Sequence, residues 1–101
     1  MTKIFKIYLG LKHPITEVEY CELEVINLIK KIVDSATIYH TKGLWHGHLE
    51  TTLVIEVLEN EYYDYNRIKD IAKYLMNEYE QQAVMVTQSD VDVEFFNSRE
   101  L

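Results

Sequence analysis

Over the first 58 residues the spacing of apolar positions changes twice, from the period of a strand to that of a helix and back. In "KIFKIYLGL", Phe5, Ile7, Leu9 and Leu11 fall on every second position, which is the period of a strand with one buried face. Residues 17–33 carry apolar side chains at helical spacing, and Thr16 followed by Glu19 has the form of a capping box. The pattern therefore predicts a strand over 3–11 and a helix over 17–33, with Cys21 on the buried side of that helix.

The period returns to two between Ala36 and Leu58, so the chain has to turn back inside this segment. A turn at His46-Gly47 sets Ile38 opposite Ile55 and Trp45 opposite His48. This register collects the apolar side chains on one face: Ala36, Ile38, Leu44, Leu49, Leu53, Ile55 and Val57. A turn at Lys42-Gly43 would scatter the same set, so the first register is preferred.

The rest of the chain predicts a second helix and two more extended segments. Apolar residues recur at helical spacing over 65–80, and "AVMVTQ" is typical of a strand. After "SD", the alternating segment "VDVEFF" predicts a short edge strand or extended tail. The order β-α-β-β-α-β predicts an α+β, ferredoxin-like fold with a short extra C-terminal strand. At this length, residues 1–101 form a single domain.

In this topology both helices cover one sheet face and leave the other open. The open face is expected to carry Tyr8, Tyr39, Trp45 and Val54. Aromatic side chains are frequent anchors of protein interfaces, so this face predicts self-association as a dimer or trimer. The alternative is a half-exposed sheet whose aromatic residues simply favour strand geometry.

One end of the domain gathers most of the candidate chemistry. The end of the first strand, the hairpin turn and the end of the second helix meet there, with Gln81 and Gln82 close by. The candidate ligand-binding residues at this pole are Lys12, His13, Lys42, Trp45, His46, His48 and Glu50.

The histidines do not predict a metal site, despite three of them lying between His40 and His48. Zinc needs three or four ligands, and the preferred register lets only His48 and Glu50 point together. No cysteine is close enough to complete a set. Neither a metal nor another cofactor is therefore predicted.

Catalytic signals are sparse. No nucleophile with a base and no glycine-rich phosphate loop stands at a characteristic spacing. His48 and Glu50 could form a general-base pair, so an enzyme is kept as an alternative to a noncatalytic role.

Charge and cysteine content narrow the partners. Seventeen acids against ten Lys and Arg give a net charge of −7, which disfavours direct binding to nucleic acid or to an anionic membrane. The single Cys21 excludes an intrachain disulfide, and no apolar run has the length of a membrane span. A cytoplasmic location is expected.

The element order, the opening "IYLG" and the stretch "ATIYHTKGLWHGHLETTLVIEV" resemble the PII-like and CutA-type small ferredoxin-like proteins. This resemblance implies an oligomer that binds a nucleotide or other small anion near the hairpin, with Lys42, His46 and His48 as local candidates. The pattern of Gly43, Trp45, Gly47 and Glu50 is also similar to that of uncharacterised small bacterial and phage proteins. That resemblance implies a binder that sequesters a host signalling nucleotide or blocks a host defence protein.

Together these features predict a noncatalytic, self-associating binding module that takes a small anionic ligand or a protein at the hairpin pole. One alternative is an acidic inhibitor of a host defence or nucleic-acid-binding protein, acting through residues such as Glu59, Glu61 and Asp64. The other is a small enzyme that depends on His48 and Glu50.

Overall fold

The computed structural model describes residues 1–98 and contains four strands and two helices. In chain order these are β1 (Thr2–Gly10), α1 (Glu22–Ile32), β2 (Thr37–Trp45), β3 (His48–Leu58), α2 (Tyr65–Glu78) and β4 (Met85–Val91). None of the helices in this part of the chain has the length and apolar character needed to cross a membrane.

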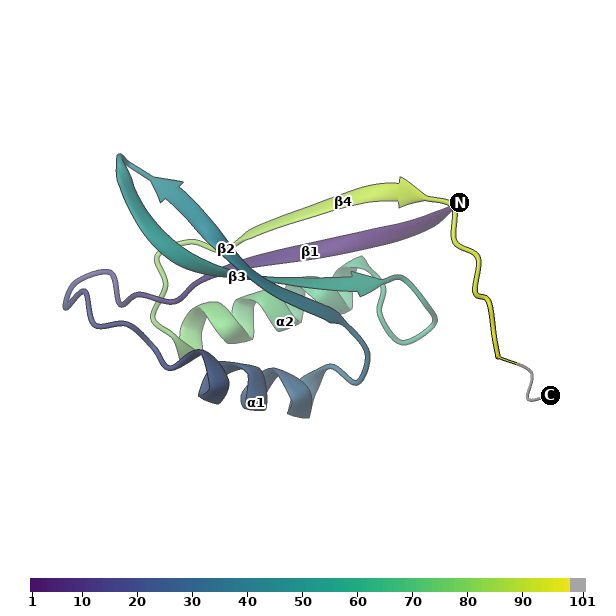
Figure 1. Ribbon diagram of the computed structural model, residues 1–101, viewed down its shortest axis with the longest axis horizontal. Coiled ribbons are helices and arrows are strands. Elements are labelled where there is room, and N and C mark those ends of the chain that lie inside the picture. The colour runs from purple at the N-terminus through teal and green to yellow at the C-terminus, as the bar shows by residue number, and fades with distance from the viewer. Residues whose placement is uncertain (99–101) are drawn as a thin grey trace.

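The strands form one antiparallel sheet in the order β2-β3-β1-β4, and both helices pack on the same face of it (Figure 1). This confirms the predicted α+β class, and the strand order is compatible with a ferredoxin-like fold. The opposite face of the sheet carries no helix (Figure 1). Anything that binds there meets strand side chains directly.

The core lies between the sheet and the two helices. Phe5, Ile7 and Leu9 point into it from β1, because alternate strand residues face the same side. Their buried partners on the other elements include Val25, Ile29, Leu53, Ile55, Val57, Ile68, Ile71 and Leu75. The core thus uses the alternating and helical apolar positions that the sequence predicts.

The hairpin turn lies at His46-Gly47, as predicted. Both residues have positive φ, 48° and 81°, which suits a tight turn between twisted strands. Trp45 pairs with His48, and Ile38 pairs with Ile55. The predicted register is therefore confirmed.

The tip of this hairpin extends beyond the helices and curls away from them (Figure 1). Leu44 and Leu49 keep the predicted core-side parity, but they remain 66% and 62% exposed because no helix reaches them. Their expected burial in the core is thus wrong.

The first helix begins five residues later than predicted. Residues 11–21 instead form a loop, in which Lys12 bridges Glu19 and the backbone N–H of His13 donates to the carbonyl of Val18. The Thr16 hydroxyl accepts from Val18 N–H at 3.4 Å inside this loop and caps no helix. The capping-box prediction was therefore wrong.

The same shift changes the environment of Cys21. It stands at the N-cap of α1, makes no side-chain capping bond and is exposed to solvent. The expectation of a buried Cys21 fails because the helical apolar stripe begins only at Val25, whereas Val18 lies in the loop and is exposed.

The "SD" segment is not a break between two strands. Ser89 and Asp90 continue β4 and pair with Ile4 and Lys3 of β1, and the Lys3 ammonium lies 2.7 Å from the Asp90 carboxylate. Residues 92–98 then form no strand. The predicted short extra C-terminal strand is therefore absent from residues 1–98.

Candidate functional site

The hairpin tip, the loop after β1 and the link between α2 and β4 lie at the same end of the molecule (Figure 1). A cavity of about 330 Å³ opens among these segments. Its walls come from segments that are distant in sequence. Six of the seven predicted ligand-binding residues line it: Lys12, His13, Trp45, His46, His48 and Glu50.

Lys42 is the candidate that the structure leaves out. It pairs with Thr51 on the parity of β2 that faces the helices, whereas Gly43 and Trp45 face the open side. Its side chain therefore belongs to the other face of the hairpin and is not part of the cavity wall.

The Glu50 carboxyl group is the strongest candidate for a chemical role in this cavity. A Cβ at residue 10 would overlap the Glu50 Oε1 atom, so the carboxyl group lies directly across Gly10 of β1. Burial raises the pKa of the Glu50 carboxyl above its usual value, and the nearby positive charge of Lys12 opposes part of that rise. The site therefore holds a half-buried acid against a glycine that leaves room for it.

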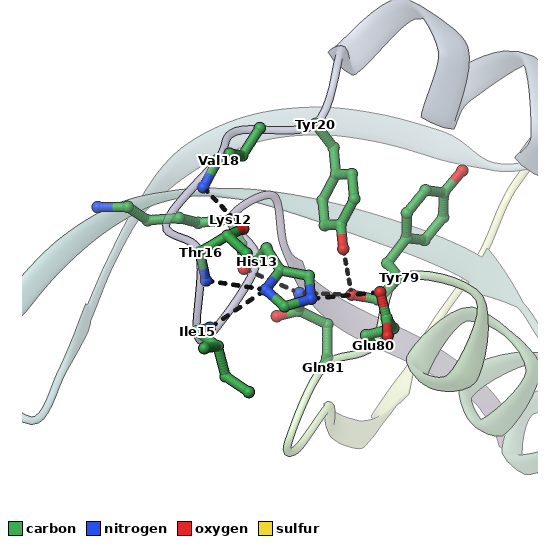
Figure 2. Close-up of polar contacts among 9 residues, drawn as sticks. All are labelled: Lys12, His13, Ile15, Thr16, Val18, Tyr20, Tyr79, Glu80 and Gln81. Carbon is green, nitrogen blue, oxygen red and sulfur yellow. Dashed lines mark hydrogen bonds and ion pairs between the residues drawn. The ribbon is translucent and has the colours of Figure 1, made fainter.

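Gln81 lies on the same side of Gly10 as this acid and binds the loop after β1. Its side-chain Nε2 donates to the backbone carbonyls of Lys12 and Tyr79, both at 3.0 Å (Figure 2). Its Oε1 would lie 3.0 Å from a Cβ at Gly10, which places the amide beside the Glu50 carboxyl group. The Gln81 amide thus ties the loop after β1 to the segment that follows α2.

A tyrosine pair reinforces that connection. The Tyr20 hydroxyl donates to the Tyr79 carbonyl at 2.9 Å, and the two rings meet edge to face at 5.0 Å between centroids (Figure 2). The loop is therefore anchored at both of its ends to the C-terminal end of α2.

The charges around the cavity do not favour an anion. Among residues 1–98, Lys12 is the only lysine or arginine that lines the cavity, and its ammonium lies 3.6 Å from the Glu17 carboxylate. Glu17 and Glu50 both line the cavity. A cationic or neutral ligand meets less repulsion here than an anion does.

No three His, Cys, Asp or Glu side chains of residues 1–98 are grouped so that they could hold a metal ion. His40 points away from the cavity, and its Nδ1 lies 3.3 Å from Glu22 of α1.

The four predicted interface residues do share the open face of the sheet, since Tyr8 pairs with Val54, and Val54 with Tyr39. Val54 is already buried within the chain, and Tyr8 also lines the cavity. Tyr39 and Trp45 keep substantial exposed area.

Trp45 also shapes the open face next to the cavity. Its Nε1 and the Thr52 Oγ1 would each lie 2.6 Å from a Cβ at residue 43. Gly43 therefore leaves the space that the Trp45 indole nitrogen and the Thr52 hydroxyl occupy.

The acids named for the inhibitor alternative have mostly structural roles. Asp64 caps α2 by accepting from Arg67 N–H at 2.8 Å, and Glu59 accepts from Lys3 N–H at 3.0 Å. Of the three acids, only Glu61 is exposed and makes no hydrogen bond to another of residues 1–98.

Sequence reasoning missed Glu17, Glu80 and Met85. Glu17 and Met85 line the cavity, and Glu80 contacts His13. The capping-box pattern assigned Glu17 to a helix. The structure places it in the loop between β1 and α1, from which its side chain lines the cavity.

No protein-family model matches the sequence, and no curated protein matches it significantly. Two solved structures share its fold. The chain is similar to a phage SAM lyase in complex with S-methyl-5'-thioadenosine, with a TM-score of 0.66 and 17% identity over 88% of this chain and 81% of that one. It is also similar to a phage SAM lyase in the apo state, with a TM-score of 0.67 and 18% identity over 94% of this chain and 92% of that one.

These likenesses agree with the predicted resemblance to small phage proteins, whereas no comparison supports the PII-like and CutA-type resemblance. They also contradict the prediction of a noncatalytic binding module, because the solved structures with this fold and length are of an enzyme. The enzyme alternative that named His48 and Glu50 fits them better. One of those structures holds a small ligand, which agrees with a small-molecule partner in general terms.

Proposed function

We propose that this protein is an enzyme that cleaves S-adenosylmethionine (SAM) and releases S-methyl-5'-thioadenosine. The observation that carries the proposal is the Glu50 carboxyl group, half-buried across Gly10 in a cavity whose wall includes aromatic side chains. The fold likeness to phage SAM lyase supports the same conclusion.

The chemistry of the substrate suits these walls. SAM carries a sulfonium, so the bond from sulfur to the amino-acid chain can break with its electron pair moving onto sulfur. The substrate's own carboxylate can attack the carbon that leaves sulfur, so the products are the neutral thioether S-methyl-5'-thioadenosine and a five-membered lactone of the amino-acid chain. Tyr8 and Trp45 line the cavity and offer ring faces that attract both an adenine ring and a cationic sulfur.

We assign Glu50 to the substrate's ammonium group. The positive charge on sulfur disappears as the bond breaks, so a carboxylate beside the sulfonium would stabilise the substrate more than the transition state. The ammonium group keeps its charge throughout, and a carboxylate there orients the amino-acid chain without that penalty. Lys12, on the same wall, would bind the substrate carboxylate.

The test is to incubate the purified protein with SAM and to follow S-methyl-5'-thioadenosine by liquid chromatography and mass spectrometry. Glu50→Gln is expected to lower the rate by about 100-fold, the usual cost of losing a positioning contact. Glu56→Gln is the matched control: Glu56 lies on the same strand and face but pairs with Lys6 at 3.9 Å and is outside the cavity. Absence of product from the wild-type protein would overturn the proposal.

We also infer that the enzyme self-associates through the open sheet face. Tyr39, Trp45 and Met85 lie on that face with exposed side chains, next to a cavity that opens at its edge. Native mass spectrometry should give a dimer or trimer for the wild-type protein. Tyr39→Glu should shift it toward monomer, whereas a monomeric wild-type protein would contradict the inference.

A further inference from the structure

The chain leaves β4 with an aromatic and acidic segment that packs against nothing in the domain. Phe95 and Phe96 are 74% and 86% exposed, and Asp92 and Glu94 alternate with Val93 and Phe95. The segment runs away from the sheet beyond the end of β4 (Figure 1). Alternation of this kind is what a strand needs to present one apolar and one charged face.

The opposite edge of the sheet offers a matching surface. β2 pairs with β3 on one side only, so the backbone groups on its other side are available to a further strand. Its side chains also alternate: His40 and Lys42 face the helix side, whereas Tyr39 and Thr41 face the open side. Lys42 makes no ion pair within residues 1–98.

We propose that residues 92–96 of one copy add to β2 of a second copy as an antiparallel fifth strand. The charges select the register. With Asp92 opposite Lys42, Glu94 falls opposite His40, so each acid faces a basic residue on the helix side. Lys42 is the stronger determinant of the two, because His40 Nδ1 already lies 3.3 Å from Glu22 of its own chain.

The same register aligns the aromatic residues. Phe95 falls opposite Tyr39 on the open face, and Phe96 falls opposite Ile38, which already packs against the core. A shift of two residues in one direction sets Glu94 against Ile38, and a shift in the other sets Asp92 against Leu44. Either shift breaks one charge pair and separates Phe95 from Tyr39.

The partner has to be a second copy because the chain cannot reach its own β2 in this register. Val91 pairs with Thr2 of β1, which holds Asp92 at the β4 edge. β2 lies three strands away, at about 14 Å. Asp92 is one residue beyond Val91 and cannot cover that distance.

Such a contact joins two different surfaces, the tail of one copy and the edge of the next. A head-to-tail contact of this kind closes into a ring when its rotation allows. It also covers an edge strand that would otherwise be open to unselective pairing. The inference concerns assembly and does not depend on the proposed lyase activity.

Cross-linking tests the register directly. In a Cys21→Ser background, a Thr41→Cys chain is mixed with a Val93→Cys chain, because these two positions fall opposite each other and leave the four contact pairs intact. Directly opposed residues have Cβ atoms close enough for a disulfide, so the mixed dimer should form at least about tenfold faster than with Glu61→Cys in place of Thr41→Cys. A yield no higher than that of the Glu61→Cys control overturns the proposal.

Charge reversal provides the second test, read by native mass spectrometry of the full chain. Lys42→Glu should weaken association by about tenfold, since like charges then face each other across the strands. Adding Asp92→Lys to the same chain should restore it, while Glu61→Lys should have no effect. Unchanged association in Lys42→Glu, failure of the rescue, or a monomeric wild-type protein would each overturn the proposal.

Discussion

His13 Nε2 lies 3.2 Å from Glu80 Oε2, and this contact joins the loop after β1 to the second residue beyond the end of α2 (Figure 2). On the other side of the same ring, Nδ1 accepts hydrogen bonds from the backbone N–H groups of Ile15 and Thr16 at 3.2 and 3.1 Å. A ring nitrogen that accepts has no proton of its own, so the neutral ring carries its proton on Nε2 and donates to Glu80. One imidazole therefore both folds the loop and ties it to the opposite wall of the cavity.

Replacing His13 should separate these two roles. His13→Ala removes both backbone acceptors and is expected to lower the free energy of unfolding by about 1–3 kcal/mol. His13→Asn should recover most of this loss, because an Asn oxygen can accept from the N–H groups two and three residues ahead. Urea denaturation of the two variants gives the comparison. An Asn variant no more stable than the Ala variant would contradict the assigned role of Nδ1.

The ionisation of Glu50 should be visible in the pH dependence of stability. Burial raises the pKa of its carboxyl above the ordinary value of 4.5, so the folded chain keeps a proton that the unfolded chain releases. This contribution to stability is complete below the unfolded pKa and is lost as the pH rises through the folded pKa. Glu50→Gln should therefore be more stable than wild type at pH 7, and the difference should disappear below about pH 4.

Denaturation of both proteins across this pH range measures the effect, with Glu56→Gln as the control on the same strand. A stability gain that persists at low pH would mean that the gain does not come from the charge of Glu50.

The floor of the cavity provides a steric test. In Gly10→Ala, the new methyl group would overlap Glu50 Oε1 and press against Gln81 Oε1, so the carboxyl group has to move. Because displacing a positioning group by about 1 Å can cost about 100-fold in rate, cleavage of SAM should fall by about that factor.

Ser89→Ala, on the same sheet face but paired with Ile4 far from the cavity, should leave the rate unchanged. A Gly10→Ala enzyme with wild-type activity would argue against a role for the Glu50 position.

The hairpin was predictable because its register is decided by local parity. A turn at His46-Gly47 sets Ile38 directly opposite Ile55 on the core-side face, and a one-residue slip would reverse every side chain. The same parity placed Trp45, His48 and Glu50 together. The alternation of apolar and polar residues did not reveal that the hairpin extends beyond the helices. How far the helices cover the sheet depends on where α1 and α2 lie in space.

The loop over 11–21 was not predictable from local patterns. Thr16 and Glu19 have the spacing of a capping box, and Val18 continues a helical stripe. The contacts that hold these residues in a loop are long-range. Glu80 and Gln81, almost 70 residues away in the sequence, bind His13 and the Lys12 carbonyl. Tertiary contacts of this kind override helix propensity, and they leave no trace in the period of the sequence.

Thr52 offers the last test, because its Oγ1 is buried on the open face with no hydrogen-bond partner within residues 1–98. A buried hydroxyl without a partner costs free energy, and valine has nearly the same shape without the hydroxyl. Thr52→Val should therefore raise the free energy of unfolding by about 1 kcal/mol in urea denaturation, whereas Thr87→Val at an exposed position of the same face should change it little. A less stable Thr52→Val protein would mean that the hydroxyl is bonded in solution, to water, to a neighbouring copy or to a bound ligand. Repeating the denaturation with S-methyl-5'-thioadenosine present would identify the ligand case, because only a bond to that molecule makes the loss depend on its concentration.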